Sequence, residues 1–261
     1  MDFSNLTSIF FTSLLFSSSP SDPVSLPKLD VDLLLFPLNL EYLEAEFSLW
    51  VPPPIGTTKA NLDPLTRDII TQFAYQEVGH LSALQKSVPG FPRPLLDLNS
   101  ENFAKVMNSI FVHKLEPPFD PYANALNYLL ASYVVPYVGL TGLRKRKMVR
   151  IGTSSKLVHA NKKVDLYLHT VSEFTNKISR LRNRLGGIGI KDERIIVPPT
   201  LGAERKISGN LLAGDQFSMS FALTSQETLR IVYSNGNEKS PGGFFPEGAD
   251  GWIARSYLHN I

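Results

Sequence analysis

Glu77 and His80 lie three residues apart and form a Glu-x-x-His motif, which could bind a metal ion. This motif is called the Glu-x-x-His step below. Residues at this spacing lie on one face of a helix, so the carboxylate and the imidazole can both coordinate the same ion. The step is the core element of di-iron and di-manganese carboxylate bundles, which take about four carboxylates and two imidazoles from four helices. One step is a fragment of such a site, and the surrounding helices decide whether the rest is present.

The step falls in the second half of a helix with a clear start. Asp63 can cap it, Pro64 suits the first helical position, and the helix is expected to run to about Ser87. Apolar residues recur on the faces that carry Glu77 and His80, so the step should border the interior of the fold.

A helix before it is predicted from about Asp30 to Trp50, because apolar residues recur there at helical spacing. Asp30 or Asp32 is a suitable N-cap, and Pro37 predicts either a kink or a late start. Downstream, a short helix is expected over 100–111. The pair Asp120-Pro121 should then open an uncharged, buried helix over 122–140.

Two capping boxes mark helices nearer the C-terminus. Thr170 with Glu173 starts a helix that should end at the glycines 186–187, and Thr224 with Glu227 starts a short one to about Ser234. The exposed face of the first of these helices is expected to hold four basic residues, Lys177, Arg180, Arg182 and Arg184. The fold class expected is mainly α, a helical bundle with a loop-rich C-terminal extension.

Composition narrows the classes of function. The 261 residues are 43% hydrophobic and 19% charged, which suits a globular chain, and the net charge of +2 points to no polyanionic partner. Cysteine is absent, so disulfides, thiolate metal sites and cysteine nucleophiles are excluded. The basic stretch 144–150 has no interleaved aromatic residues, and we interpret it as a solvated loop rather than a nucleic-acid site. The glycines 186–189 lack the Lys-Ser/Thr of a phosphate loop.

The N-terminus has the character of a secretory signal. Residues 6–16 are largely apolar, too short to span a bilayer as a helix, and are followed by small residues that suit a cleavage point. The leading residues 1–5 carry no Lys or Arg, unlike a typical signal. We expect a signal peptide and leader over 1–25, an extracellular protein of the apoplast or cell wall, and no integral membrane segment after the signal is removed.

Several long strings in the chain resemble the plant desiccation-related proteins with a ferritin-like domain. They include residues 36–47, 61–80, 90–97, 118–124 and 135–142, with further matches at 207–210, 229–233 and 241–246. The resemblance covers most of 27–142 and 169–258. It implies a secreted or cell-wall plant protein linked to dehydration stress.

The resemblance also implies which residues would hold metal: Glu41 from the first helix, and Glu77 with His80 from the second. Glu44 and Glu46 are interpreted as solvated or paired charges rather than ligands. The third helix should offer an inward Glu, yet residues 122–140 contain no acidic residue. A degenerate site of three ligands is therefore expected. We expect it to hold no cofactor, and iron or manganese is the alternative if the three residues still bind metal.

Two departures from the family pattern concern missing segments. The first helix runs straight from Val51 into prolines, where relatives continue, and a basic and polar insert over 143–168 stands where relatives have a further bundle helix. The expected organisation is a leader over 1–25, a ferritin-like domain over 26–186, and an extension over 187–261 that packs on the same domain. A truncated paralogue and a misread gene model would both give this pattern.

The expected function is a secreted, stress-associated protein that is not an enzyme and acts by a binding or protective mechanism. Glu77 and His80 would then be inherited polar residues that hydrogen-bond each other, Tyr42, Tyr75 or a backbone carbonyl. Two alternatives stay open. One is a metal-dependent oxidase-like enzyme at Glu41, Glu77 and His80, and the other is a module that binds a small molecule in the bundle interior, lined by tyrosines 42, 75, 128 and 133. A cell-wall or small-molecule partner is expected, and no nucleic acid.

Overall fold

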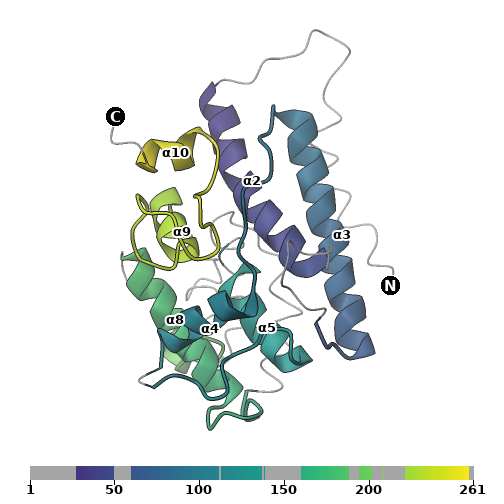
Figure 1. The fold of residues 1–261 in the computed structure, drawn as a ribbon, viewed down its shortest axis with the longest axis vertical. Coiled ribbons are helices and arrows are strands. Elements are labelled where there is room, and N and C mark those ends of the chain that lie inside the picture. Colours follow the sequence, from purple (N-terminus) through teal and green to yellow (C-terminus); the bar gives the residue numbers. More distant parts are fainter. Residues whose placement is uncertain are drawn as a thin grey trace.

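The computed structural model describes residues 28–49, 60–111, 113–136, 138, 160–187, 194–201, 208 and 221–258. This part of the chain is helical and contains no strand, which confirms the mainly α prediction. Figure 1 shows the two long helices, α2 and α3, beside a group formed by the other helices. Their bounds are α2 (Lys28–Leu49), α3 (Pro64–Ser87), α4 (Ser100–Asn108), α5 (Ala125–Val134), α8 (Val171–Gly186), α9 (Ser225–Val232) and α10 (Trp252–Leu258), with a 3-10 turn η1 (Pro199–Leu201).

The antiparallel helices α2 and α3 lie side by side and make the most extensive helix contact in the described structure (Figure 1). The start of α3 is as predicted, with the Asp63 side chain accepting a hydrogen bond from the backbone of Thr66 and Pro64 in the first turn. Helix α2 already begins at Lys28, so the N-cap predicted at Asp30 or Asp32 is wrong. It also continues on both sides of Pro37, which excludes the late start.

The two helices differ in how deeply they are buried. From Phe36 to Phe47, α2 is almost continuously buried, because other elements cover it on several sides. Helix α3 has 24 residues, of which only Ile70, Ala74 and Glu77 are buried. Most of its surface is therefore at least partly open to solvent, and its most extensive contact with another helix is the one with α2.

The helix predicted over 122–140 starts later than the sequence suggested. The Asp120 side chain accepts a hydrogen bond from the backbone of Tyr122 and closes a turn instead of capping a helix. The cap of α5 is Asn124, whose side chain accepts from the backbone of Asn127. The apolar residues of α5 are buried as expected, including Tyr128, Leu130, Ala131 and Tyr133.

Both predicted capping boxes are confirmed. Thr170 and Glu173 form one at the start of α8, and Thr224 and Glu227 form one at the start of α9. Helix α8 ends at Gly186, and its C-cap Gly187 adopts a φ of 78° that glycine reaches without steric cost.

One basic residue predicted on the exposed face of α8 is buried. The guanidinium of Arg182 lies 4.5 Å from the centre of the Tyr133 ring and donates a hydrogen bond to the Tyr133 carbonyl. Tyr133 belongs to the last turn of α5, where backbone carbonyls lack a partner within the helix. Arg182 is inside because it supplies that partner from the neighbouring helix.

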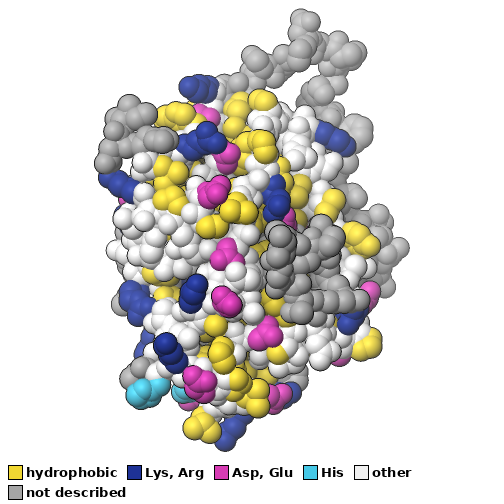
Figure 2. Space-filling view, viewed as in Figure 1, with side chains coloured by type: hydrophobic (Ala, Val, Ile, Leu, Met, Phe, Trp, Pro, Cys, Tyr) yellow, Lys and Arg dark blue, Asp and Glu magenta, His cyan; other side chains and the backbone are white. Residues whose placement is uncertain are grey.

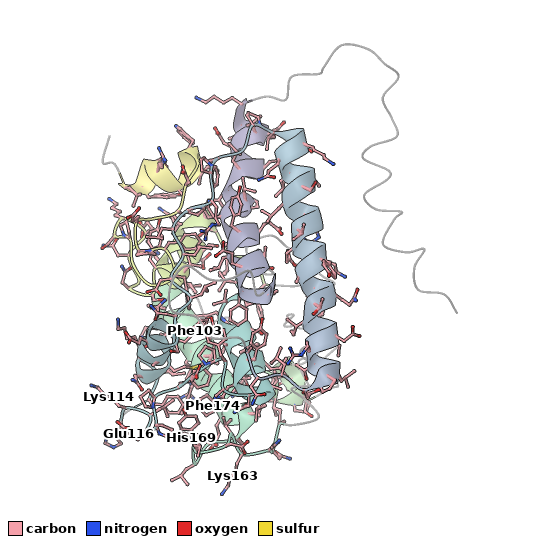
Figure 3. All side chains as sticks on the ribbon, turned by 45° about the vertical axis from the view of Figure 1, so that its right-hand side comes forward. Phe103, Lys114, Glu116, Lys163, His169 and Phe174 are labelled. Carbon is pink, nitrogen blue, oxygen red and sulfur yellow. The ribbon has the colours of Figure 1, made fainter. Side chains whose placement is uncertain are left out.

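The far end of the molecule from α10 is closed by aromatic packing. Figure 3 shows His169 and Phe174 together there, near Lys163 and Glu116. The His169 ring lies 4.8 Å from that of Phe111 and 6.1 Å from that of Phe174. This histidine therefore serves as a packing residue at the start of α8.

Several sequence-based expectations fall on residues outside the described part of the chain: the signal peptide, Trp50 and the prolines after it, and the basic stretch 144–150. Of the expected insert, residues 160–168 are described, and they form turns with an isolated antiparallel bridge from Lys163 to Thr170. None of the described helices is long and apolar enough to cross a membrane. Figure 2 shows acidic and basic side chains interspersed on one face, without a field of a single sign.

Candidate metal site

The antiparallel pairing of α2 and α3 brings Glu41, Glu77 and His80 together. The His80 Nδ1 atom lies 2.9 Å from Glu77 Oε2 on its own helix and 3.1 Å from Glu41 Oε2 on the facing helix. Both glutamates are buried, whereas 27% of the His80 side chain is exposed. The three residues implied by resemblance thus meet at one point, with the imidazole on the solvent side.

The distances fit three donors around one ion. One nitrogen and two carboxylate oxygens from these residues all lie within 4.8 Å of one another. Metal–ligand bonds of about 2.1 Å place neighbouring donors about 3.0–3.4 Å apart. The measured separations of 2.9 and 3.1 Å are close to this range, and they also suit hydrogen bonds from a single N–H shared between two carboxylates.

One buried oxygen of this group has no hydrogen-bond partner among the described residues. It is the Oε1 atom of Glu77, which is fully buried. Leaving a buried charged oxygen unpaired costs free energy, on the order of 1–3 kcal/mol or more. A cation between the two helices would remove this cost, so the residues fit a bound metal ion better than a purely structural cluster.

The interpretation of Glu44 as a solvated or paired charge is wrong. Only 3% of this residue is exposed, and burial together with the nearby charge of Glu77 raises its pKa well above the ordinary value. Its spacing of three from Glu41 was a usable signal, because it places both carboxylates on one face of α2. Glu46 is paired as expected, with its Oε1 atom 2.5 Å from Arg93 Nη1.

The tyrosines expected to line a ligand cavity have other roles. Tyr75 points outward, with 65% of its surface exposed. Tyr42 donates a hydrogen bond to the Phe91 carbonyl, and Tyr128 donates one to the Phe47 carbonyl while its ring stacks on the Phe47 ring. These contacts make Tyr42 and Tyr128 parts of the core.

Nothing in the neighbouring sequence supplies the second half of a di-metal site. From Pro121 to Val164 the chain contains no Asp or Glu, so α5 and the segment after it offer no carboxylate. Of the other histidines within the described residues, His113 is exposed and His169 packs against aromatic rings. The donors that come together are enough for a single ion.

Two facing helices that carry a carboxylate and a Glu-x-x-His step define half of a di-metal carboxylate bundle. The family model of the ferritin-like domain matches residues 29–147, which include Glu41, Glu77 and His80. The ferritin-like catalase Nec2 of Nesocodon mauritianus is 43% identical, over 99% of this chain and 100% of its own length. The desiccation-related protein PCC13-62 of Craterostigma plantagineum is 48% identical, over 93% of this chain and 91% of its own length.

The chain belongs to this family of ferritin-like, desiccation-related proteins, as its sequence indicated. No solved structure was found to match it. The alignment with the Nesocodon protein extends over 317 positions and this chain has 261 residues, so at least 56 aligned positions face a gap here. The chain thus lacks segments that this relative possesses.

Proposed function

We propose that this protein is a secreted, stress-associated member of its family that binds one divalent transition-metal ion between α2 and α3. The observation that carries the proposal is the contact of His80 Nδ1 with a buried carboxylate oxygen from each helix, at 2.9 and 3.1 Å. The unpartnered Oε1 of Glu77 supports a cation at this point. Carboxylate and imidazole donors together suit manganese or iron.

A single ion agrees with the donors that the sequence provides. Two-ion sites of this fold take about six side chains from four helices. Here α2 and α3 supply one carboxylate and one Glu-x-x-His step, and the 44 residues from Pro121 to Val164 contain no acid. The proposed role is therefore to hold metal rather than to activate oxygen between two ions.

The name of one relative supports the physiological part of this proposal, and the name of the other supports a second candidate function. The Craterostigma relative is described as desiccation-related. A protein that sequesters redox-active metal outside the cell would limit oxidative damage as solutes concentrate during drying. The Nesocodon relative is described as a catalase, and a bound manganese or iron ion would supply the change of oxidation state that disproportionation of hydrogen peroxide requires.

Metal analysis tests the leading proposal. Protein loaded with Mn²⁺ or Fe²⁺ and then desalted should retain about one ion per chain. Glu77→Gln and His80→Ala should each lose it, while Glu46→Gln, a carboxylate on α2 that pairs with Arg93, should keep it. Metal-free wild type, or equal retention in all variants, would overturn the proposal.

A peroxide assay separates the two functions. Oxygen release from hydrogen peroxide by the loaded protein, abolished by Glu77→Gln, would favour the catalase. Metal retention without peroxide turnover would favour sequestration.

A further inference from the structure

Two neighbouring leucines at the end of the molecule opposite α10 have no role in the metal site. Leu166 is 78% exposed and Leu168 is 88% exposed, which makes them the two most exposed large apolar side chains of the described residues. A single exposed leucine is ordinary on a protein surface, but neighbouring ones that project from one loop mark a contact surface. This pair is therefore the strongest candidate for a docking point outside the metal site.

The backbone holds the two leucines at the tip of a short hairpin, residues 162–171. The Val164 N–H donates to the His169 carbonyl at 2.9 Å, and the Val171 N–H donates to the Lys162 carbonyl at 3.0 Å. Within the tip, the Tyr167 N–H donates to the Val164 carbonyl at 3.0 Å. These hydrogen bonds fix the shape of the tip.

Tyr167 lies between the two leucines and anchors the tip to the core. Only 8% of this residue is exposed, its hydroxyl donates to the Pro117 carbonyl at 3.0 Å, and its ring centre lies 5.9 Å from that of Phe174. Tyr167 points inward, whereas its two neighbours in the chain, Leu166 and Leu168, are exposed. They form a pre-organised apolar tip, which loses little conformational freedom when it binds a partner.

Leu166 also has a backbone conformation that leucine rarely adopts. Its φ is 70°, in the left-handed region where side chains other than those of asparagine and aspartate are sterically disfavoured. Leucine is thus unsuited to this position by its backbone angle as well as by its exposure, so the stability of the hairpin does not account for it. Backbone strain of this kind is typical of functional loops.

The charges near the tip are mixed, with a small excess of lysine. The exposed lysines and acids at this end are Lys114, Glu116, Lys162, Lys163, Asp165 and Glu173. Figure 3 shows Lys114, Glu116 and Lys163 there together. The carboxylate of Glu173 is already used, because it accepts a hydrogen bond from the Thr170 N–H at 2.6 Å in the capping box of α8. The three lysines therefore outnumber the two remaining carboxylates by one.

We propose that this hairpin docks the protein on an anionic phospholipid surface, with Leu166 and Leu168 inserted among the lipids and the lysines at the phosphate groups. A projecting apolar tip suits a soft interface that closes around it, and the long lysine side chains reach the headgroup level. Two leucines bury fewer carbons than a myristoyl chain, whose association constant is about 10⁴ M⁻¹, so the docking is weak and reversible. An excess of one positive charge strengthens it about fivefold on an anionic surface.

Sedimentation with vesicles of phosphatidylcholine, with and without phosphatidylserine, tests the proposal on the full chain. The tip variant Leu166→Asn/Leu168→Ser should bind mixed vesicles about tenfold or more weaker than wild type. Its melting temperature should stay equal or rise, because asparagine tolerates the φ of position 166. The matched control, Leu29→Ser/Leu33→Ser, removes two exposed leucines at the start of α2 and should bind as wild type does. All variants share residues 1–25, so the apolar N-terminal run contributes equally to each measurement.

Two further measurements locate the contact. Lys162→Gln/Lys163→Gln should weaken binding to the mixed vesicles by about fivefold per lysine and leave binding to pure phosphatidylcholine unchanged. Because the chain has no cysteine, a polarity-sensitive dye on Leu168→Cys reports the tip alone, and its emission should shift to the blue when vesicles are added.

The inference is overturned if wild type binds neither vesicle, if the tip and control variants lose binding equally, or if the lysine variant binds mixed vesicles as wild type does. Analytical ultracentrifugation without lipid tests the other occupant. A wild-type dimer that dissociates in the tip variant would assign the two leucines to a second copy of the chain instead of a lipid surface.

Discussion

Asn39 and Asp250, 211 residues apart, exchange two hydrogen bonds that join α2 to the loop before α10. The Asn39 side-chain amide donates to the Asp250 carbonyl at 2.8 Å, and the Asp250 backbone N–H donates to Asn39 Oδ1 at 2.7 Å. Asn39 is buried and lies two residues before Glu41. The C-terminal region therefore helps to fix the helix that carries Glu41, one of the three donors of the candidate site.

Asn39→Ala should destabilise the protein by about 2–4 kcal/mol, because it leaves both backbone groups of Asp250 without partners in a largely buried place. Urea unfolding measures the change. Gln72→Ala, at an exposed position of α3, is the control and should shift stability by less than about 0.5 kcal/mol. A small effect of Asn39→Ala would show that water replaces these bonds.

Substitution by alanine should change the stability of the protein in opposite directions at two glycines, Gly79 and Gly243. A Cβ atom at Gly79, inside α3, would meet nothing within 4 Å. Gly79→Ala is thus expected to stabilise the protein by about 0.5–1 kcal/mol through helix propensity. At Gly243, where φ is 52°, a Cβ atom would lie 2.6 Å from Ser234 Oγ and 2.8 Å from the Tyr233 carbonyl carbon, so Gly243→Ala should cost about 2 kcal/mol or more. Thermal unfolding of the two variants is the measurement, and a loss of stability in Gly79→Ala would contradict the open surface of α3.

Arg182→Leu should lower stability by about 2–4 kcal/mol, because the Tyr133 carbonyl at the end of α5 loses its donor and the ring loses the cation above it. Arg180→Leu changes an exposed arginine of the same helix and should have little effect. Denaturant titration of both variants compares them. Equal effects would mean that Arg182 contributes only through its apolar stem.

The ion pair of Glu238 and Arg230 predicts a pH dependence. Arg230 Nε donates to Glu238 Oε2 at 2.6 Å, and this bond holds the pKa of Glu238 below its ordinary value. A carboxyl group whose pKa is lowered by folding stabilises the protein at pH values above its unfolded pKa of about 4.3. That stabilisation is lost as the pH falls through the pKa of the folded state. Glu238→Gln should therefore lower the melting temperature by about 2–6 °C at pH 7.

The difference between wild type and Glu238→Gln should shrink below about pH 4, since the wild-type carboxyl is then becoming protonated as well. Melting curves across this range test the sign. A difference that stays constant with pH would show that the variant acts through packing rather than through the charge of Glu238.

Helix starts that depend on local chemistry were predictable from sequence. Asp63 with Pro64 and the two capping boxes place a side-chain acceptor next to the backbone it serves, so a few residues decide the outcome. Asp120-Pro121 has the same Asp-Pro pattern, but the helix start predicted from it was wrong, because α5 begins at Ala125. There the Tyr122 carbonyl accepts from the Asn61 backbone and the Tyr122 hydroxyl donates to the Leu98 carbonyl, so distant contacts hold this residue out of the helix.

The wrong predictions for Glu44 and Arg182 arose from burial, which their residue types did not indicate. Glu44 and Arg182 are residue types typical of a solvated surface, and they were assigned to it for that reason. Helix α2 is covered on several sides, which takes Glu44 into the interior. Arg182 is buried because the last turn of α5 offers it a carbonyl, and the register between two helices distant in sequence determines that contact.

Because α2 makes the most extensive helix contact of α3, metal binding at the proposed site would oppose the local unfolding of α3. Glu77 and His80 both lie on α3, whereas Glu41 lies on α2, so an ion held by all three would fasten the outer helix to the rest of the molecule. Each detachment of α3 would release two donors at once. Amide hydrogen exchange in α3 would then follow the free metal concentration, slowing by about a hundredfold when that concentration is a hundred times the dissociation constant. A bound ion would thus raise the free energy of detaching α3, so that the helix would stay packed against α2 for longer.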